Sequence, residues 1–147
     1  DKLKGRDSRI YLIVGDGESD EGQVWEAFSF AAAKKLDNLV VLLDWNKRQL
    51  DGWTDDVMPM GDYVEKFRAF GFDTVKVDGN DVEALSEALA HTRTGNGKPF
   101  AIVMDTVKGY GIKDVAETVM NHSLPVSDEQ YAKWMAELKS ELAALEG

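Results

Sequence analysis

The sequence predicts an α/β fold, in which an open, mostly parallel sheet has helices on both of its faces. Two observations support this fold class. Apolar segments typical of strands recur along the chain, at residues 10–14, 39–43, 72–77 and 100–107. The segments between them carry apolar residues at helical spacing, and such alternation of strands with helices is typical of parallel sheets. We therefore expect one domain over residues 1–147, with at least four parallel strands.

Composition limits the classes of function. With 147 residues, of which 44% are hydrophobic, the chain is long enough to bury a core. Its 27 acidic and 17 basic residues give a net charge of −10, which argues against nucleic acid or an anionic membrane as a partner. The chain has no cysteine, and no run of about eighteen apolar residues that could span a membrane. Its charged start does not resemble a signal peptide, so we expect a cytoplasmic protein.

The first strand, residues 10–14, follows a polar lead-in at residues 1–8. Because this strand is apolar throughout, we expect it to lie in the centre of the sheet with cover on both faces. A Gly-Asp-Gly turn at residues 15–17 comes next and is followed by a helical pattern with one apolar face. The residues of that face are Val24, Phe28, Ala31, Ala32 and Leu36.

The second strand ends just before Asn46, and the two strands with the helix between them predict a right-handed βαβ unit. Asp16 and Asn46 then lie at the carboxyl ends of neighbouring parallel strands, which is the edge where open α/β sheets bind ligands. Carboxylate and carboxamide oxygens are hard ligands suited to Mg²⁺ or Ca²⁺. Gly15 and Gly17 allow the backbone to turn sharply and to approach a ligand closely. The sequence therefore predicts a site for a divalent cation at this edge.

These residues resemble the thiamin-diphosphate signature, in which a Gly-Asp-Gly turn is followed by an asparagine thirty positions after the aspartate, as Asn46 follows Asp16. The flanking segments 21–22, 26–27 and 50–52 resemble the N-terminal, diphosphate-binding region of transketolase. The resemblance extends over nearly all 147 residues, which correspond to only part of a family enzyme. We therefore expect a partial diphosphate-binding domain whose N-terminal part is missing from this chain.

The resemblance implies a role for each matching residue. The residues expected to bind Mg²⁺ or Ca²⁺ are Asp16, Asn46 through its side chain, and Arg48 through its backbone carbonyl. Those expected to bind thiamin diphosphate are Gly15, Gly17, Asn46, Leu50 and His122. Those expected to have catalytic roles are His122, Glu21 and Glu26. The two glutamates match acids that lie near the subunit interface in the family.

The remaining segments complete the alternation of strands and helices. Residues 53–62 lack periodicity and are predicted to form a loop. Residues 63–70 are predicted to form a short amphipathic helix that ends at Gly71, and residues 81–92 a further helix. His91 lies on a polar face of that helix, and we predict no function for it.

A third loop at the carboxyl edge follows the last strand. The segment 106–111, Thr-Val-Lys-Gly-Tyr-Gly, resembles a segment of transketolase. His122 matches a histidine that in the family lies beside the cofactor diphosphate and the substrate. The chain departs from the family around this histidine, because Ser123 stands where glycine is usual and Asn121 precedes it.

Residues 127–146 are predicted to form a C-terminal amphipathic helix. Ser127 and Gln130 have the spacing of a capping box at its start. An apolar stripe along this helix is expected to pack on the sheet or on a neighbouring element. Its residues are Tyr131, Trp134, Met135, Leu138, Leu142 and Leu145.

The resemblance implies the diphosphate- and metal-binding part of a transketolase, which transfers two-carbon ketol units from ketose phosphates to aldose phosphates in the pentose phosphate pathway. The implied partners are sugar phosphates and a pyrimidine-binding domain or subunit, which in the family carries the glutamate that activates the cofactor. We therefore expect a dimer or a split enzyme, and no activity from the isolated chain.

Two alternatives remain open. The first is an α-type subunit of a 2-oxoacid dehydrogenase, which shares the signature, and the segments 50–52 and 108–111 argue against it. The second is a non-catalytic α/β fragment that folds or assembles without cofactor.

Overall fold

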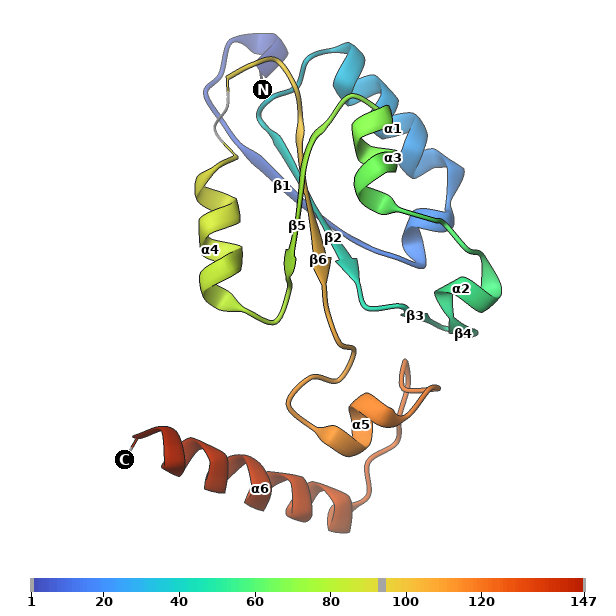
Figure 1. Cartoon of the computed structure of the whole chain (residues 1–147), viewed down its shortest axis with the longest axis vertical. Helices are drawn as coiled ribbons and strands as arrows, with labels where there is room; N and C mark the ends of the chain where they lie inside the picture. Colours follow the sequence, from blue (N-terminus) through green and yellow to red (C-terminus); the bar gives the residue numbers. More distant parts are fainter. Residues whose placement is uncertain (1, 93–94, 147) are drawn as a thin grey trace.

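Four parallel strands form one sheet in the computed structural model, which describes residues 2–92 and 95–146 (Figure 1). In spatial order the strands are β1 (Ile10–Gly15), β2 (Leu39–Trp45), β6 (Phe100–Asp105) and β5 (Asp73–Asp78). Each of the three pairings between neighbours is parallel. The predicted α/β fold class is therefore confirmed.

Helices cover both faces of this sheet (Figure 1). α1 (Gly22–Ala33) and α3 (Tyr63–Ala69) lie on one face, and α4 (Val82–Ala90) lies on the other. Successive residues of the strands point to opposite faces, so each helical layer has its own apolar core. The core under α1 and α3 comprises Val14, Phe28, Ala31, Val41, Leu43, Tyr63, Phe67, Phe72, Ala101 and Val103. The core under α4 comprises Val40, Ala88, Phe100 and Ile102.

The first strand, β1, lies at an edge of the described sheet. The prediction of a central strand with cover on both faces was therefore wrong for the described residues. The register places Tyr11 and Ile13 on the same face as Val40 and Leu42, which is the face that α4 covers farther along the sheet. None of the described helices lies over β1 on this face, and Tyr11 and Ile13 are 54% and 68% exposed. The apolar sequence of this strand reflects a surface that the described chain leaves uncovered.

The loops at the carboxyl edge contain short elements that the sequence did not predict. After β1 comes the 3-10 turn η2 (Glu18–Asp20). After β2, β3 (Arg48–Gln49) and β4 (Gly52–Trp53) pair as an antiparallel hairpin, and α2 (Thr54–Val57) follows. The predicted loop at 53–62 thus begins with a strand residue and a helical turn.

The C-terminal segment forms α5 (Lys113–Glu117) and α6 (Asp128–Glu146), which lie beyond the carboxyl edge of the sheet (Figure 1). The predicted capping box is present at the start of α6. The N–H of Gln130 donates to Ser127 Oγ (3.2 Å), and the N–H of Ser127 donates to Gln130 Oε1 (3.0 Å). Among the described residues, no helix combines the length and apolar character needed to cross a bilayer.

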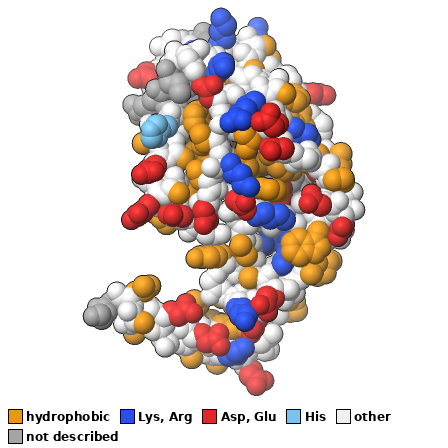
Figure 2. Space-filling view, viewed as in Figure 1, with side chains coloured by type: hydrophobic (Ala, Val, Ile, Leu, Met, Phe, Trp, Pro, Cys, Tyr) orange, Lys and Arg blue, Asp and Glu red, His pale blue; other side chains and the backbone are white. Residues whose placement is uncertain are grey.

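α6 is attached to α5 through Trp134. The indole N–H of Trp134, which is 6% exposed, donates to the carboxylate of Asp114 (3.0 Å). Lys133 pairs with the same carboxylate (2.7 Å). The other end of the predicted stripe is open, since Leu142 and Leu145 are 55% and 85% exposed, and Figure 2 shows a notch between this end of α6 and the body of the molecule. The first half of the stripe therefore packs toward α5, with Trp134 buried and Met135 and Leu138 half-buried, and its distal end is left open.

Candidate functional site

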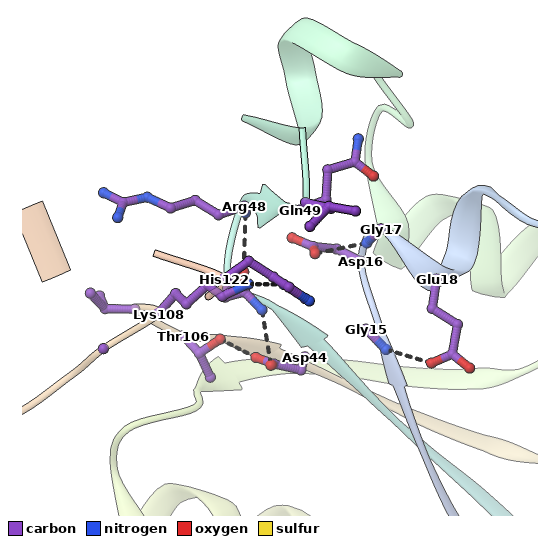
Figure 3. Close-up of a pocket in the computed structure, with 14 residues that line it drawn as sticks. Gly15, Asp16, Gly17, Glu18, Asp44, Arg48, Gln49, Thr106, Lys108 and His122 are labelled. Atoms are coloured by element: carbon purple, nitrogen blue, oxygen red, sulfur yellow. Dashed lines mark hydrogen bonds between the residues drawn. The ribbon is translucent and has the colours of Figure 1, made fainter. Parts of the chain in front are cut away.

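A cavity of about 740 Å³ lies at the carboxyl edge of the sheet (Figure 3). Its walls come from three loops, which follow β1, β2 and β6. The parallel register aligns the ends of these strands, because Gly15 pairs with Asp44 and Asp44 pairs with Met104. The predicted site residues that line the cavity are Gly15, Asp16, Gly17, Asn46, Arg48, Leu50 and His122.

Asp16 is fixed in the turn after β1 and is only 1% exposed. Its Oδ1 accepts a hydrogen bond from the N–H of Gly17 (2.8 Å), and its Oδ2 accepts one from the N–H of Lys47 (2.6 Å). Burial raises the pKa of the Asp16 carboxyl above its ordinary value, while these two hydrogen bonds act in the opposite direction. Each oxygen keeps a lone pair beyond these bonds, so the carboxylate can also bind a cation.

Asn46 is oriented by two neighbours at the end of the central strands. Its Nδ2 donates to Oδ2 of Asp44 (3.0 Å), and its Oδ1 accepts from the N–H of Arg48 (3.1 Å). The hydroxyl of Thr106, just after β6, donates to the other oxygen of Asp44. The amide nitrogen of Asn46 is therefore engaged, and its amide oxygen has a free lone pair for a ligand.

Lys47 connects the loop after β2 to the end of β6. Its backbone adopts a left-handed conformation (φ 65°), which is uncommon for a residue with a side chain. Its ammonium pairs with Asp105 and donates to the carbonyl of Thr106 (3.0 Å), and Lys76 pairs with the same carboxylate (2.8 Å). Burial alone raises the pKa of Asp105, but the hydrogen bonds from Lys47 and Lys76 outweigh it and hold that pKa below its usual value.

The β3–β4 hairpin packs closely on the Gly-Asp-Gly turn. A Cβ added to Gly17 would lie 2.7 Å from Cβ of Gln49, so this approach requires glycine. The guanidinium of Arg48, a residue that is 8% exposed, lies 4.4 Å from the ring centroid of Trp53 and donates to the carbonyl of Thr118. Arg48 thus ties the hairpin to the loop after α5.

His122 and Lys108 meet on the third wall of the cavity (Figure 3). Nζ of Lys108 lies 2.9 Å from Nδ1 of His122. Because an ammonium can only donate, Nδ1 is the acceptor and the ring proton resides on Nε2. Asn121 holds this loop, since its Nδ2 donates to the carbonyls of Lys108 (3.3 Å) and Val115 (2.9 Å). The departure from the family pattern at Asn121 therefore has a structural role here.

Five polar residues that line the cavity were not predicted as site residues, and they are Glu18, Asp44, Gln49, Thr106 and Lys108. Glu18 and Asp44 lie close to predicted ligands in the sequence, and Lys108 belongs to a segment that already resembled transketolase. Their position beside motif residues in the sequence was thus the signal that could have identified them as site residues.

The structure does not bring Glu21 and Glu26 into the cavity. Both side chains are exposed, with Glu21 at the N-cap of α1 and Glu26 inside that helix. Both residues therefore lie on the surface of the described chain and do not line the cavity.

The donors of the cavity suit a hard cation bound together with an anionic ligand. No group of three or more His, Asp or Glu side chains that could hold a metal occurs within residues 2–92 and 95–146. Asp16 and Asn46 supply only two side-chain ligands, so a backbone carbonyl, water and ligand oxygens have to complete the coordination. Mg²⁺ commonly binds in this way when it bridges a protein and a phosphate group. The ammonium of Lys108 adds a positive charge on the cavity wall.

Comparisons with known proteins show which proteins this chain is similar to. The family model described as "Transketolase, thiamine diphosphate binding domain" matches residues 2–142. A 6-deoxy-6-sulfo-D-fructose transketolase subunit of Clostridium sp. (strain MSTE9) is 38% identical over 132 residues, which cover 90% of this chain and 48% of that protein. An apulose-4-phosphate transketolase subunit of Actinobacillus succinogenes is 38% identical over 129 residues, which cover 87% and 46%. The chain therefore spans about half the length of these two relatives.

Solved structures show the same similarity. The transketolase of Campylobacter jejuni matches with a TM-score of 0.82 and 28% identity, over 90% of this chain and 21% of that one. The transketolase of Leishmania mexicana matches with a TM-score of 0.68 and 26% identity, over 95% and 25%. The family model, the relatives and the folds are thus consistent with one another.

Proposed function

The chain belongs to the family of transketolase thiamine diphosphate binding domains, and we propose that it forms the diphosphate- and metal-binding half of an active site that transfers two-carbon ketol units. The observation that carries this proposal is the convergence on one cavity of Asp16, Asn46 and His122, which come from three separate loops. In this proposal residues 1–147 are one diphosphate-binding domain, and residues 127–146 are its C-terminal helix.

The proposed metal is Mg²⁺ or Ca²⁺, bound by the Asp16 carboxylate, Oδ1 of Asn46 and the backbone carbonyl of Arg48. The hydrogen bonds from the N–H groups of Gly17 and Lys47 support this role for Asp16, because they fix the carboxylate before any metal binds. Preorganised ligands bind more tightly because less conformational freedom is lost on binding. The remaining positions would be filled by water and by oxygens of the cofactor diphosphate.

The proposed cofactor contacts lie around the same cavity. Gly15 and Gly17 line the cavity and are proposed to contact the diphosphate there, and Lys108 supplies a nearby cation. His122 carries its ring proton on Nε2, which makes it a hydrogen-bond donor toward the diphosphate or the substrate. Leu50 is 60% exposed on the cavity rim and is proposed to line the thiazolium ring.

The chemistry of carbon–carbon bond cleavage belongs to the cofactor, since bound thiamin diphosphate supplies the electron sink. The proposed contribution of the chain is to position the cofactor. The fixed carboxylate of Asp16 and the oriented amide of Asn46 would hold the diphosphate end, so that the reactive ring has a defined place. Glu21 and Glu26 are proposed to act from the interface with a partner chain, because they lie outside the cavity.

The partner is proposed to be a pyrimidine-binding domain or subunit, in a homodimer or a split enzyme. One observation supports this, because both relatives described above are named as subunits. The residues that line the described cavity are proposed to hold the metal and the diphosphate, and the activation of the aminopyrimidine ring is left to the partner. Activity is therefore proposed for the native assembly of this chain with its partner chains.

The proposed substrates are sugars that carry an anionic group, with ketose phosphates as donors and aldose phosphates as acceptors. Intermediates of the pentose phosphate pathway are one such set. One relative is named for a sulfonated sugar and another for apulose 4-phosphate, so the donor panel has to include sulfonated and branched sugars.

A ketol-transfer assay on the native assembly tests the proposal. With thiamin diphosphate and Mg²⁺ present, we expect a new ketose to form from a ketose donor and an aldose acceptor, and no product when the cofactor is left out. An assembly that instead oxidises pyruvate with lipoamide would overturn the proposal.

A further inference from the structure

Next to the Gly-Asp-Gly turn lies a buried hydrogen-bond network that joins α3 to Asp16. Ser19 is fully buried and Tyr63 is 4% exposed. Oγ of Ser19 donates to the backbone carbonyl of Asp16 (2.6 Å). The hydroxyl of Tyr63 lies 2.9 Å from Oγ of Ser19 and 3.3 Å from the same carbonyl. Two hydroxyl groups from different elements thus converge on one backbone atom.

The direction of these bonds follows from the number of protons. Ser19 has a single hydroxyl proton, and it is used in the bond to the Asp16 carbonyl. The bond between the two hydroxyls is therefore donated by Tyr63 and accepted by Ser19, and the Tyr63 proton is shared with the Asp16 carbonyl. Burial raises the pKa of the Tyr63 hydroxyl to about 12, so the phenol keeps its proton at neutral pH.

The polar groups of Asp16 are all engaged as a result. Its N–H donates to the carbonyl of Asp44 (3.1 Å), and its own carbonyl also accepts from the N–H of Ser19 (3.1 Å). Its two carboxylate oxygens accept from the N–H groups of Gly17 and Lys47. Fixing the peptide on one side and the carboxylate on the other leaves the side chain a single direction.

The network is itself anchored in the two helices that cover this face of the sheet. The indole N–H of Trp25, on α1, donates to the carbonyl of Ser19 (2.7 Å). Tyr63 is the first residue of α3, and the side chain of Asp62 caps that helix by accepting from the N–H groups of Val64 and Glu65. The position of the two hydroxyls is therefore set by the packed core and not by the loop alone.

We infer that Tyr63 and Ser19 are positioning residues for the cofactor site, because their hydroxyls hold the Asp16 backbone and so aim its carboxylate at the metal. The inference rests on the proposed function and adds to it two residues that do not line the cavity. A core position needs no hydroxyl for packing alone, and burying one costs free energy unless it is hydrogen-bonded. Here both hydroxyls donate to the backbone carbonyl of Asp16, the residue that is proposed to bind the metal.

The experiment compares Tyr63→Phe with Tyr131→Phe, which makes the same change at a site that is 60% exposed on α6. Thiamin diphosphate is titrated into the native assembly by calorimetry over a series of Mg²⁺ concentrations, and melting temperatures are measured with and without both ligands. We expect Tyr63→Phe to weaken thiamin diphosphate binding about 10-fold, as for other groups that orient a metal ligand. We also expect a higher Mg²⁺ requirement and a smaller rise in melting temperature on binding, whereas Tyr131→Phe behaves as wild type.

Ser19→Ala tests the same contact from the other side and removes only one oxygen atom. It should weaken binding similarly, and the double variant should lose less than the product of the two single effects, because both hydroxyls act through one carbonyl. The inference is overturned if Tyr63→Phe and Ser19→Ala lower the melting temperature of the metal-free protein but leave the cofactor affinity and the Mg²⁺ requirement of wild type. Wild-type protein that binds no thiamin diphosphate in the presence of Mg²⁺ would instead overturn the proposed function, and this inference with it.

Discussion

Oδ2 of Asp44 accepts a hydrogen bond from Nδ2 of Asn46 (3.0 Å). Together with the N–H of Arg48, which donates to Oδ1 of Asn46 (3.1 Å), this contact leaves a lone pair of the amide oxygen to face the cavity. An amide rotated by 180° would present its NH₂ group, which repels a metal ion. Thr106 holds the other oxygen of Asp44, so the carboxylate cannot turn away. The proposed metal site therefore depends on a residue that is not itself proposed as a ligand.

Asp44→Ala should weaken Mg²⁺-dependent binding of thiamin diphosphate about 10-fold, because it removes the acceptor that orients Asn46. Calorimetry on the native assembly measures the affinity. Asp51→Ala, which changes an exposed aspartate in the following hairpin, is the matched control and should bind as wild type. Equal affinities for the two variants would show that Asn46 is oriented by other contacts.

Asp16→Ala should abolish Mg²⁺-dependent binding of thiamin diphosphate. Asp16 is the only carboxylate among the proposed ligands, so its loss leaves two neutral oxygens for a divalent cation. The measurement is a titration with Mg²⁺, with Ca²⁺ and with a chelator. Binding that needs no metal and survives this substitution is incompatible with the proposed metal site.

His122→Ala should lower ketol transfer by the native assembly about 100-fold, which is typical for loss of a positioned hydrogen-bond donor at a reacting centre. His91→Ala is the control, because His91 is exposed at the C-terminal end of α4 and its Nδ1 is hydrogen-bonded to the carbonyl of Glu87 (2.7 Å) in its own helix. An assembly in which the two variants transfer ketol units equally well would contradict this role of His122.

The isolated wild-type chain should show no ketol transfer, because the proposed activation of the cofactor is left to the partner. Robust transfer by the isolated chain would contradict the need for a partner.

Stability should fall in acid as Asp105 loses its charge. Burial raises the pKa of this carboxyl, but the hydrogen bonds from Lys47 and Lys76 lower it by more than burial raises it. The folded-state pKa therefore lies below the ordinary value of 3.8. The unfolded state therefore binds more protons in this range, and the free energy of unfolding rises with pH until the unfolded carboxyl is ionised above about pH 4. Because the side chain is 36% exposed, the contribution is on the order of 1 kcal/mol or less.

Urea denaturation at several pH values measures this contribution. Asp105→Asn should lower the free energy of unfolding at pH 7 and flatten its pH dependence below about pH 4. Asp51→Asn should leave both as in wild type. If the free energy of unfolding of Asp105→Asn falls below pH 4 as steeply as that of wild type, the two lysine contacts add no stability.

The uncovered face of β1 should drive self-association of the isolated chain, because monomers rarely expose large contiguous apolar patches. On this face Tyr11 and Ile13 are 54% and 68% exposed, and the edge strand also exposes Ile10 and Leu12 on its other face. The distal part of α6 adds Leu142 and Leu145. Light scattering at micromolar concentrations should show oligomers, and Ile13→Lys should reduce them more than Val82→Lys, which alters an exposed valine on α4. A clean monomer across this range would contradict the prediction.

The fold class could be predicted because strands and helices have local periodicities, and the alternation of the two favours a parallel sheet. The place of β1 in the sheet could not, because strand order depends on contacts between distant segments. The sequence of residues 10–14 shows only that the strand is suited to burial. The β3–β4 hairpin has two residues in each strand and carries no periodic pattern at all.

The residues of the site also fall into those that the sequence could predict and those that it could not. Asp16 and Asn46 were found through a motif whose spacing is visible in the chain, and both line the cavity. Thr106 touches Asp44 only because β2 and β6 are neighbours in register, which no local pattern encodes. Tyr63 resembled an ordinary apolar residue at a helix start, and its hydroxyl gained a role only through contact with Ser19.

The strand order β1-β2-β6-β5 has a consequence for synthesis of the protein. β1 and β2 are successive in the chain and can pair as soon as both have left the ribosome. β5 pairs only with β6 among the described residues, so it waits without a partner until residues 100–105 have been translated. The loop with His122 emerges later still. A nascent chain therefore cannot complete its cofactor site before that loop has been made, and translation that stops before β6 leaves the open edges of two strands exposed to aggregation.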